Sequence, residues 1–283
     1  MPKPVLAEEG APMIKPVVLY TVGVLTASTL LSISLAAVFG PETASGLAVL
    51  GMAAPAIVAL LVELLVVRRD GADRASLARV FATRTDPRRL GIGLVVTVLA
   101  IMGALGVQLL VGAALGWIEY RLPDDIGALT GAIGMQFAIM LVASTGEELG
   151  WRGWLHTRLR RAGLGVVMVV TAVVWVLFHV PFLAVTGALS PAEWVTTLGS
   201  IAAVSILFTA LRERFESVWP AVVGHALLNS VVLGVQSGFT SAPAGSAAGL
   251  PFTTLICAGF LIAAVLVLRV GRRAPTVEPV AIA

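Results

Sequence analysis

Three segments of the sequence carry six polar residues whose types and spacing fit the hydrolysis of an amide bond. They are Glu147, Glu148, Arg152, His179, His225 and Asn229. A water molecule that attacks an amide needs a base to take its proton, and the developing oxyanion needs hydrogen-bond donors. Carboxylates and histidines can supply the base, and histidines with an asparagine can supply the donors. This chemistry requires no nucleophilic side chain.

The first segment has the helical spacing of an ion pair. Glu148 and Arg152 are four residues apart, so they share one face of a helix and lie within ion-pair reach. Glu147 is rotated by about 100° from Glu148. We therefore expect Arg152 to hold Glu148, while Glu147 stays free to take a proton. The alternative is a helix end at the membrane surface, followed by basic loop residues.

The other two segments contribute the histidines. His225 and Asn229 are four residues apart on one helical face, so both can donate to one point. His179 follows Trp175 by four residues and, with Glu147, can hold and deprotonate a water molecule. Structural roles remain open for both segments. His179 could bond to a helix carbonyl, and His225 with Asn229 could join two helices.

A metal-dependent version of this chemistry would use the same residues. Glu147, His179 and His225 could bind a zinc ion with one position open for water, and the spacing does not decide between the two versions. Other hydrolytic sites are excluded, because the aspartates lie between the apolar stretches and the motifs His-Glu-x-x-His and Gly-x-Ser-x-Gly are absent. The single cysteine, Cys257, excludes a disulfide framework.

The composition places these residues in a membrane protein. Hydrophobic residues make up 58% of the 283 residues and charged residues 12%, and the mean hydropathy is +0.98. A water-soluble domain of this length could not bury so much apolar surface. We predict an all-α polytopic helix bundle, a single transmembrane domain over 1–283 with its catalytic core in 131–235. Eight stretches reach the length of about 20 residues that a bilayer core requires: 17–39, 46–67, 90–117, 131–160, 164–186, 194–211, 218–238 and 251–270.

The basic residues predict the orientation of these spans. Every lysine and arginine except Arg121 falls on one side of the membrane, most densely in the loop 68–89. Basic loops stay in the cytoplasm, so both termini are expected there, in a multi-pass protein of the cell (inner or plasma) membrane. The pI near 9.6 then reflects arginines that anchor loops to an anionic leaflet, and no nucleic-acid partner is expected. The tail 274–283 is expected to be flexible.

The polar residues of three predicted spans lie at similar depth. Counted from the cytoplasmic ends at about 1.5 Å per residue, Glu147 and His179 are roughly 20 and 22 Å deep, and His225 and Asn229 are roughly 14 and 20 Å deep. A charge at mid-bilayer costs about 2.5–3.5 kcal/mol on insertion scales, so such residues usually face a cavity or a partner. We expect one shared polar pocket.

These motifs resemble those of the CPBP family, the CAAX-protease and bacteriocin-processing group that is also called Abi. The family is related to type II CAAX prenyl endopeptidases. The resemblance covers about 131–235 and consists of Glu147-Glu148-x-x-x-Arg152, an aromatic-x-x-x-His motif that ends at His179, and His225-x-x-x-Asn229. It implies an intramembrane endopeptidase in which the first glutamate and His179 activate water. In the same scheme the third motif forms the oxyanion hole, and the second glutamate and the arginine support the site.

The same resemblance carries expectations about cofactor and substrate. The family has been described both as metalloproteases and as glutamate-dependent hydrolases, which leaves zinc as a candidate cofactor. Its pattern usually has Phe where this chain has Trp175. The implied partners are membrane lipid and a peptide or protein with a hydrophobic or lipid-modified end. From the residues alone, a proton-coupled membrane transporter and a non-catalytic bacteriocin-immunity protein remain alternatives.

Overall fold

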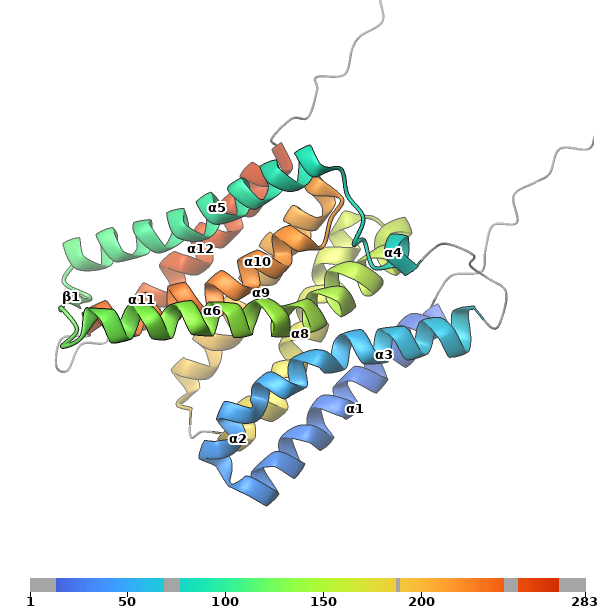
Figure 1. The fold of residues 1–283 in the computed structure, drawn as a ribbon, viewed down its shortest axis with the longest axis horizontal. Coiled ribbons are helices and arrows are strands. Elements are labelled where there is room, and N and C mark those ends of the chain that lie inside the picture. The colour runs from blue at the N-terminus through green and yellow to red at the C-terminus, as the bar shows by residue number, and fades with distance from the viewer. Residues whose placement is uncertain (1–13, 69–76, 187–188, 242–248, 270–283) are drawn as a thin grey trace, which may run out of the picture.

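The chain folds into a bundle of long helices. The computed structural model describes residues 14–68, 77–186, 189–241 and 249–269. In these residues, eight helical spans are long and apolar enough to cross a membrane, which confirms the predicted all-α polytopic architecture (Figure 1). The spans are Ile14–Phe39, Pro41–Val67, Pro87–Ala114, Ile126–Ala162, Leu164–Val185, Pro191–Phe215, Trp219–Phe239 and Gly249–Arg269.

Several spans combine more than one helical segment. The α-helices are α1 (Ile14–Phe39), α2 (Pro41–Leu47), α3 (Ala54–Val62), α4 (Leu77–Val80), α5 (Pro87–Ala114), α6 (Ile126–Glu148), α7 (His156–Leu159), α8 (Leu164–Thr186), α9 (Pro191–Phe215), α10 (Trp219–Leu227), α11 (Leu233–Phe239) and α12 (Gly249–Arg269). Short 3-10 segments cover Ala48–Ala53 and Arg160–Ala162, and π-helical segments cover Glu63–Val67, Leu149–Leu155 and Leu228–Val232. Two strands, β1 (Glu119–Tyr120) and β2 (Thr240–Ser241), pair antiparallel.

The outward faces of the helices are apolar, as a lipid environment requires. Leu110 in α5 is 70% exposed and Val142 in α6 is 77% exposed. A helix that is apolar all round belongs in a membrane or in a large core. The exposed leucines and valines therefore mark the lipid-facing surface, while the polar site residues lie inside.

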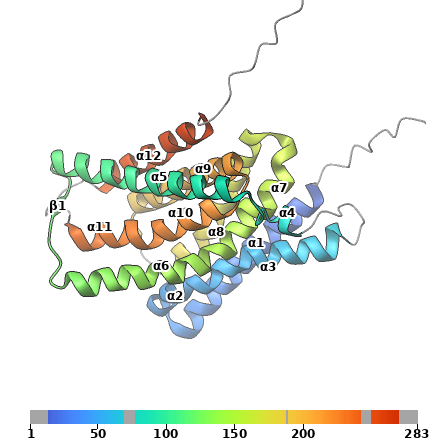
Figure 2. The ribbon, with the colours of Figure 1, turned by 45° about the horizontal axis from the view of Figure 1, so that its top comes forward.

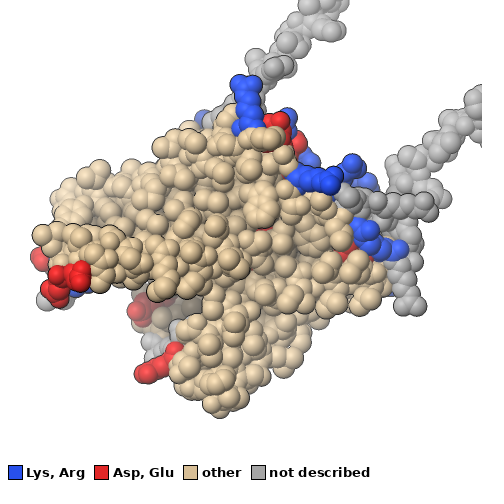
Figure 3. Space-filling model, viewed as in Figure 1, with Lys and Arg blue, Asp and Glu red and all other residues tan. Residues whose placement is uncertain are grey.

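The two ends of the bundle differ in charge. Because successive spans run in opposite directions, the described arginines gather at one end, which we call the basic end, apart from Arg121 and the buried Arg152 (Figure 3). The opposite end, the acidic end, carries five carboxylates: Glu42, Glu119, Asp124, Asp125 and Glu193. This is the charge asymmetry that the sequence predicts.

The span with the two site glutamates packs closely against its neighbours. A Cβ atom at Gly146 would lie 2.5 Å from the carbonyl oxygen of Met52, and one at Gly150 would lie 2.5 Å from the ring of Pro55. Glycine at both positions lets α6 and the π-helical segment after it approach the second span. α10 lies between α5 and α6 and also contacts α9, so the third motif sits in the middle of the bundle (Figure 2).

Some boundaries differ from the predicted ones. The third span ends at Ala114 rather than near 117, because the chain turns there toward β1. Inside the predicted loop 68–89, the described part contains α4, and Asp86 caps α5 by accepting a hydrogen bond from the backbone of Arg89 at 3.0 Å. Residues 69–76 and the predicted tail 274–283 lie outside the described residues. The predicted boundaries of the catalytic core stay a prediction.

Candidate active site

The predicted ion pair lies fully buried where α6 passes into a π-helical segment. Arg152 Nη1 is 3.0 Å from Glu148 Oε1, and both side chains are 0% exposed. Arg152 Nη2 also donates to the Ser205 hydroxyl at 2.9 Å and to its carbonyl at 3.2 Å. π-Helical turns are rare and often occur at functional sites. The alternative, a helix end at the membrane surface, does not fit this burial.

Glu147 accepts hydrogen bonds from two tryptophans. Its Oε2 accepts a hydrogen bond from Trp151 Nε1 at 3.1 Å and another from Trp175 Nε1 at 2.5 Å. Among the described residues, Oε1 has no hydrogen-bond partner, and the whole residue is 2% exposed. Two indole donors aimed at one carboxylate oxygen therefore fix the position of Glu147. Both hydrogen bonds end on Oε2, so Oε1 stays available to take a proton.

Trp175 lies at the centre of the site. Its ring is 5.5 Å from the ring of His179 and 5.3 Å from that of His225, in edge contacts. The Arg152 guanidinium carbon lies 4.4 Å from the centre of the same ring, a cation–π contact. One indole therefore contacts Glu147, Arg152 and both histidines.

His179 and His225 each have one ring nitrogen fixed by a neighbour. His179 Nδ1 is 2.8 Å from the carbonyl oxygen of Trp175. A carbonyl only accepts, so this nitrogen carries the hydrogen, and Nε2 of the neutral ring is left as the basic nitrogen. His225 Nδ1 is 2.9 Å from Glu148 Oε1, which orients that ring. The helix-carbonyl bond expected of a structural histidine is present, and it determines which ring nitrogen of His179 carries the hydrogen.

Three of the predicted site residues line one cavity. His179, His225 and Asn229 come from α8, α10 and the π-helical segment Leu228–Val232, and they border a cavity of about 670 Å³ with Trp175. This volume is within the usual range for a ligand pocket, about 300–1,000 Å³. Asn229 has no hydrogen-bond partner among the described residues, so its amide is available to a ligand. Glu147 is not part of the cavity wall and lies behind Trp175.

The proposed zinc ligands do not form a metal site as they lie. In the part of the chain that the structure describes, no group of three His, Cys, Asp or Glu side chains is placed to hold a metal ion. For Glu147, His179 and His225 the reason is local: Trp175 donates to the carboxylate, and its ring contacts both imidazoles. The residues therefore do not fit zinc in this arrangement, and we derive no catalytic step from it.

A second buried carboxylate belongs to the basic end. Glu63 is 0% exposed, accepts a hydrogen bond from Trp154 Nε1 at 2.8 Å and pairs with Arg158 and Arg68. His156 is also buried, with its Nε2 3.3 Å from Glu213. Neither residue lines the cavity, so both stabilise the packing near the basic end.

The comparison with protein families matches the part of the chain that holds this site. Residues 129–231 match the model of type II CAAX prenyl endopeptidase Rce1-like proteins. This segment is therefore similar to proteins of the CAAX-protease type. All six site residues lie inside it, and the predicted core, 131–235, covers nearly the same range. No curated protein matches the chain. The CAAX-protease family is one of intramembrane endopeptidases, and the apolar spans agree with a multi-pass membrane protein.

Three hydrogen-bond partners of the site residues were not predicted from the sequence. Trp151 and Trp175 were not assigned as hydrogen-bond donors to Glu147, although Trp151 follows it by four residues. Because residues four apart lie on the same face of a helix, this spacing could have indicated the contact between Trp151 and Glu147. Ser205, which binds Arg152 from α9, had no such signal because it is 53 residues away along the chain.

Proposed function

We propose that this CAAX-type protein hydrolyses a peptide bond of a hydrophobic or lipid-modified membrane substrate. The observation that carries the proposal is the meeting of His179, His225 and Asn229, from two separate parts of the chain, in one cavity wall. The carboxylates of Glu147 and Glu148 lie directly behind that wall. A base, oxyanion donors and supporting charges are thus present around one space.

His179 and Glu147 activate the water in this proposal. Nε2 of His179 takes a proton as the water oxygen bonds to the substrate carbonyl carbon. Glu147, joined to the same cluster through the Trp175 indole, stabilises the positive charge that forms on His179. When the carbon–nitrogen bond breaks, the leaving amine takes that proton, so acid and base roles are both filled.

Asn229 and His225 bind the oxyanion in this proposal. The Asn229 amide donates one hydrogen bond, and Nε2 of His225 donates the second when both of its ring nitrogens carry hydrogen. Glu148 fixes the His225 ring through Nδ1 and is itself held by Arg152. Arg152 and Glu148 are therefore positioning residues.

Replacing Asn229 with alanine tests the oxyanion role. Loss of one such donor lowers kcat by about 10²–10³-fold, while KM changes little because the bond strengthens in the transition state. The measurement is cleavage of a quenched fluorescent peptide by purified protein in detergent, with products identified by mass spectrometry. Thr29→Ala, an exposed polar residue of α1 that does not line the cavity, is the control. Equal kcat for Asn229→Ala and wild type contradicts the assignment.

Replacing Trp175 with phenylalanine tests the hydrogen bond to Glu147. The variant keeps an aromatic ring between the histidines but loses the indole N–H, so we expect kcat to fall about tenfold or more, since a hydrogen bond to a charged group contributes about 1.5–3 kcal/mol. Trp219→Phe is a matched control, because its indole donates to the Thr83 carbonyl at 3.0 Å, away from the site. Similar kcat values in both variants would contradict a special role for the Trp175 N–H.

A further inference from the structure

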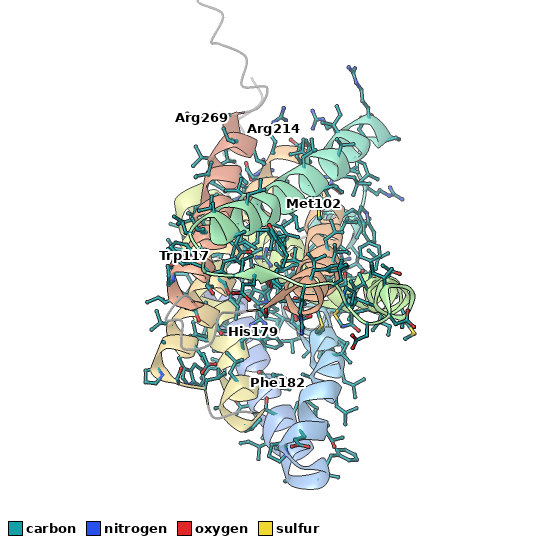
Figure 4. All side chains as sticks on the ribbon, turned by 90° about the vertical axis from the view of Figure 1, so that its left-hand side faces the viewer. Met102, Trp117, His179, Phe182, Arg214 and Arg269 are labelled. Atoms are coloured by element: carbon teal, nitrogen blue, oxygen red, sulfur yellow. The ribbon has the colours of Figure 1, made fainter. Side chains whose placement is uncertain are left out.

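The cavity extends from the site residues toward the acidic end of the bundle. Away from the site, its wall comes from the last turns of α5, the turn before β1, the end of α8, the first turns of α9, α11, and the first turns of α12. Representative wall residues are Gln108, Trp117, Leu183, Thr196, Gln236 and Phe252. Figure 4 looks onto this end, with Trp117 and His179 labelled. In Figure 3 the same end is notched, with acidic side chains on both sides of the notch.

Buried side chains close the bundle in the opposite direction. The Arg152 guanidinium is sandwiched against the rings of Trp175 and Phe208, at 4.4 and 5.3 Å. Trp154 and Leu211, nearer the basic end, are 0% exposed. No described residue of the basic end lines the cavity. A substrate coming from the basic end would have to break the buried ion pair of Arg152 to reach the histidines.

From this geometry we infer that the cavity receives its substrate from the extracytoplasmic face of the membrane. Loops rich in lysine and arginine stay in the cytoplasm, so the basic end is cytoplasmic and the acidic end faces the other side. The inference rests on the proposed function and narrows it. The substrate is a peptide segment presented at the outer face, rather than a chain end that reaches the site from the cytoplasm.

The cavity wall suits an extended hydrophobic peptide. Gln236 Nε2 donates to Gln108 Oε1 at 2.6 Å, and Gln108 Nε2 donates to the Phe252 carbonyl at 2.9 Å, which fixes both amides in the wall. Amides and hydroxyls such as that of Thr196 can bind a peptide backbone, while Trp117 and Phe252 offer apolar surface to its side chains. Carboxylates, including Glu119 of β1 opposite Ser241, border this end, so basic residues flanking the cleavage site are favoured.

Cysteine labelling tests which face of the membrane the cavity opens to. The test does not depend on catalytic activity. Ser241→Cys, at the cavity wall, and Arg161→Cys, at the basic end, are made in a Cys257→Ser background. In intact cells, we expect a membrane-impermeant maleimide to label Ser241→Cys at least tenfold faster than Arg161→Cys. Inverted membrane vesicles should reverse that order. Labelling of Ser241→Cys only in inverted vesicles overturns the inference.

An assay that offers the peptide to one membrane face at a time distinguishes a failure of this inference from a failure of the proposed function. An impermeant quenched fluorescent peptide with an apolar core and basic flanks is added to right-side-out or inverted vesicles, with Glu147→Gln vesicles as the background. We expect cleavage at least tenfold faster in right-side-out vesicles. Cleavage confined to inverted vesicles overturns the side of access and leaves the protease function intact. No cleavage from either face or in detergent overturns the protease function, and the labelling result still decides the side.

A cavity-filling variant tests whether the substrate must pass through the cavity before it is cleaved. Ser200→Trp places a large ring in the wall, whereas Val195→Trp places the same ring on the outer face of α9, where Val195 is 65% exposed. We expect kcat/KM to fall at least tenfold for Ser200→Trp and less than twofold for Val195→Trp. Equal activity in both variants means that the substrate does not pass this wall, which contradicts the inferred path.

Discussion

Replacing Glu147 with glutamine is expected to lower kcat for peptide cleavage by about 10²–10⁴-fold while the protein stays folded. The amide oxygen of glutamine can still accept hydrogen bonds from Trp151 and Trp175, so the packing is kept and only the negative charge is lost. The measurement combines kcat from the fluorescent-peptide assay with the thermal unfolding midpoint of the purified protein. The midpoint should match that of wild type within a few degrees.

Glu42→Gln is the control, because Glu42 is exposed at the acidic end and does not line the cavity. Turnover of Glu147→Gln at the wild-type rate would exclude the proposed mechanism. The same variant distinguishes the proposed protease from the two alternative functions. A transporter would lose flux without ever showing proteolysis, and a peptide-binding immunity protein would still protect cells when Glu147 is neutral.

Replacing Arg152 with alanine is expected to cause the largest loss of stability, about 3–5 kcal/mol. The substitution leaves Glu148 buried and without its cation, and it also removes the hydrogen bonds to Ser205 and the contact with the Trp175 ring. The free energy of unfolding is measured by denaturant titration in detergent. Activity should fall with it, because His225 loses the carboxylate geometry that orients its ring.

A second substitution distinguishes the uncompensated charge from the loss of packing. Glu148→Gln combined with Arg152→Ala removes both charges, so the double variant should recover part of the lost stability. Arg160→Ala is the control, since Arg160 pairs with Glu213 at 3.3 Å on the surface, where a pair contributes at most about 1 kcal/mol. If the single and double Arg152 variants are equally unstable, the ion pair is not what stabilises this part of the bundle.

The sequence alone determined the features that depend on local geometry or on bilayer thickness. The eight spans follow from runs of apolar residues long enough to cross a membrane, and the structure confirms their number within the described residues. The pair Glu148–Arg152 follows from the helical repeat, because residues four apart meet on any helix. The family resemblance follows from short motifs, and the family match covers the same segment.

Only the tertiary structure decided what surrounds each polar group. The indole of Trp175 reaches Glu147 from a helix 28 residues further along the chain, and His225 meets Glu148 across 77 residues. The path of the cavity toward the acidic end was likewise not predicted. The physical reason is that these helices are apolar on nearly every face, so no hydrophobic stripe in the sequence fixes their rotation. Close packing at Gly146 and Gly150 and the buried polar contacts set that rotation, and both exist only once the helices have assembled.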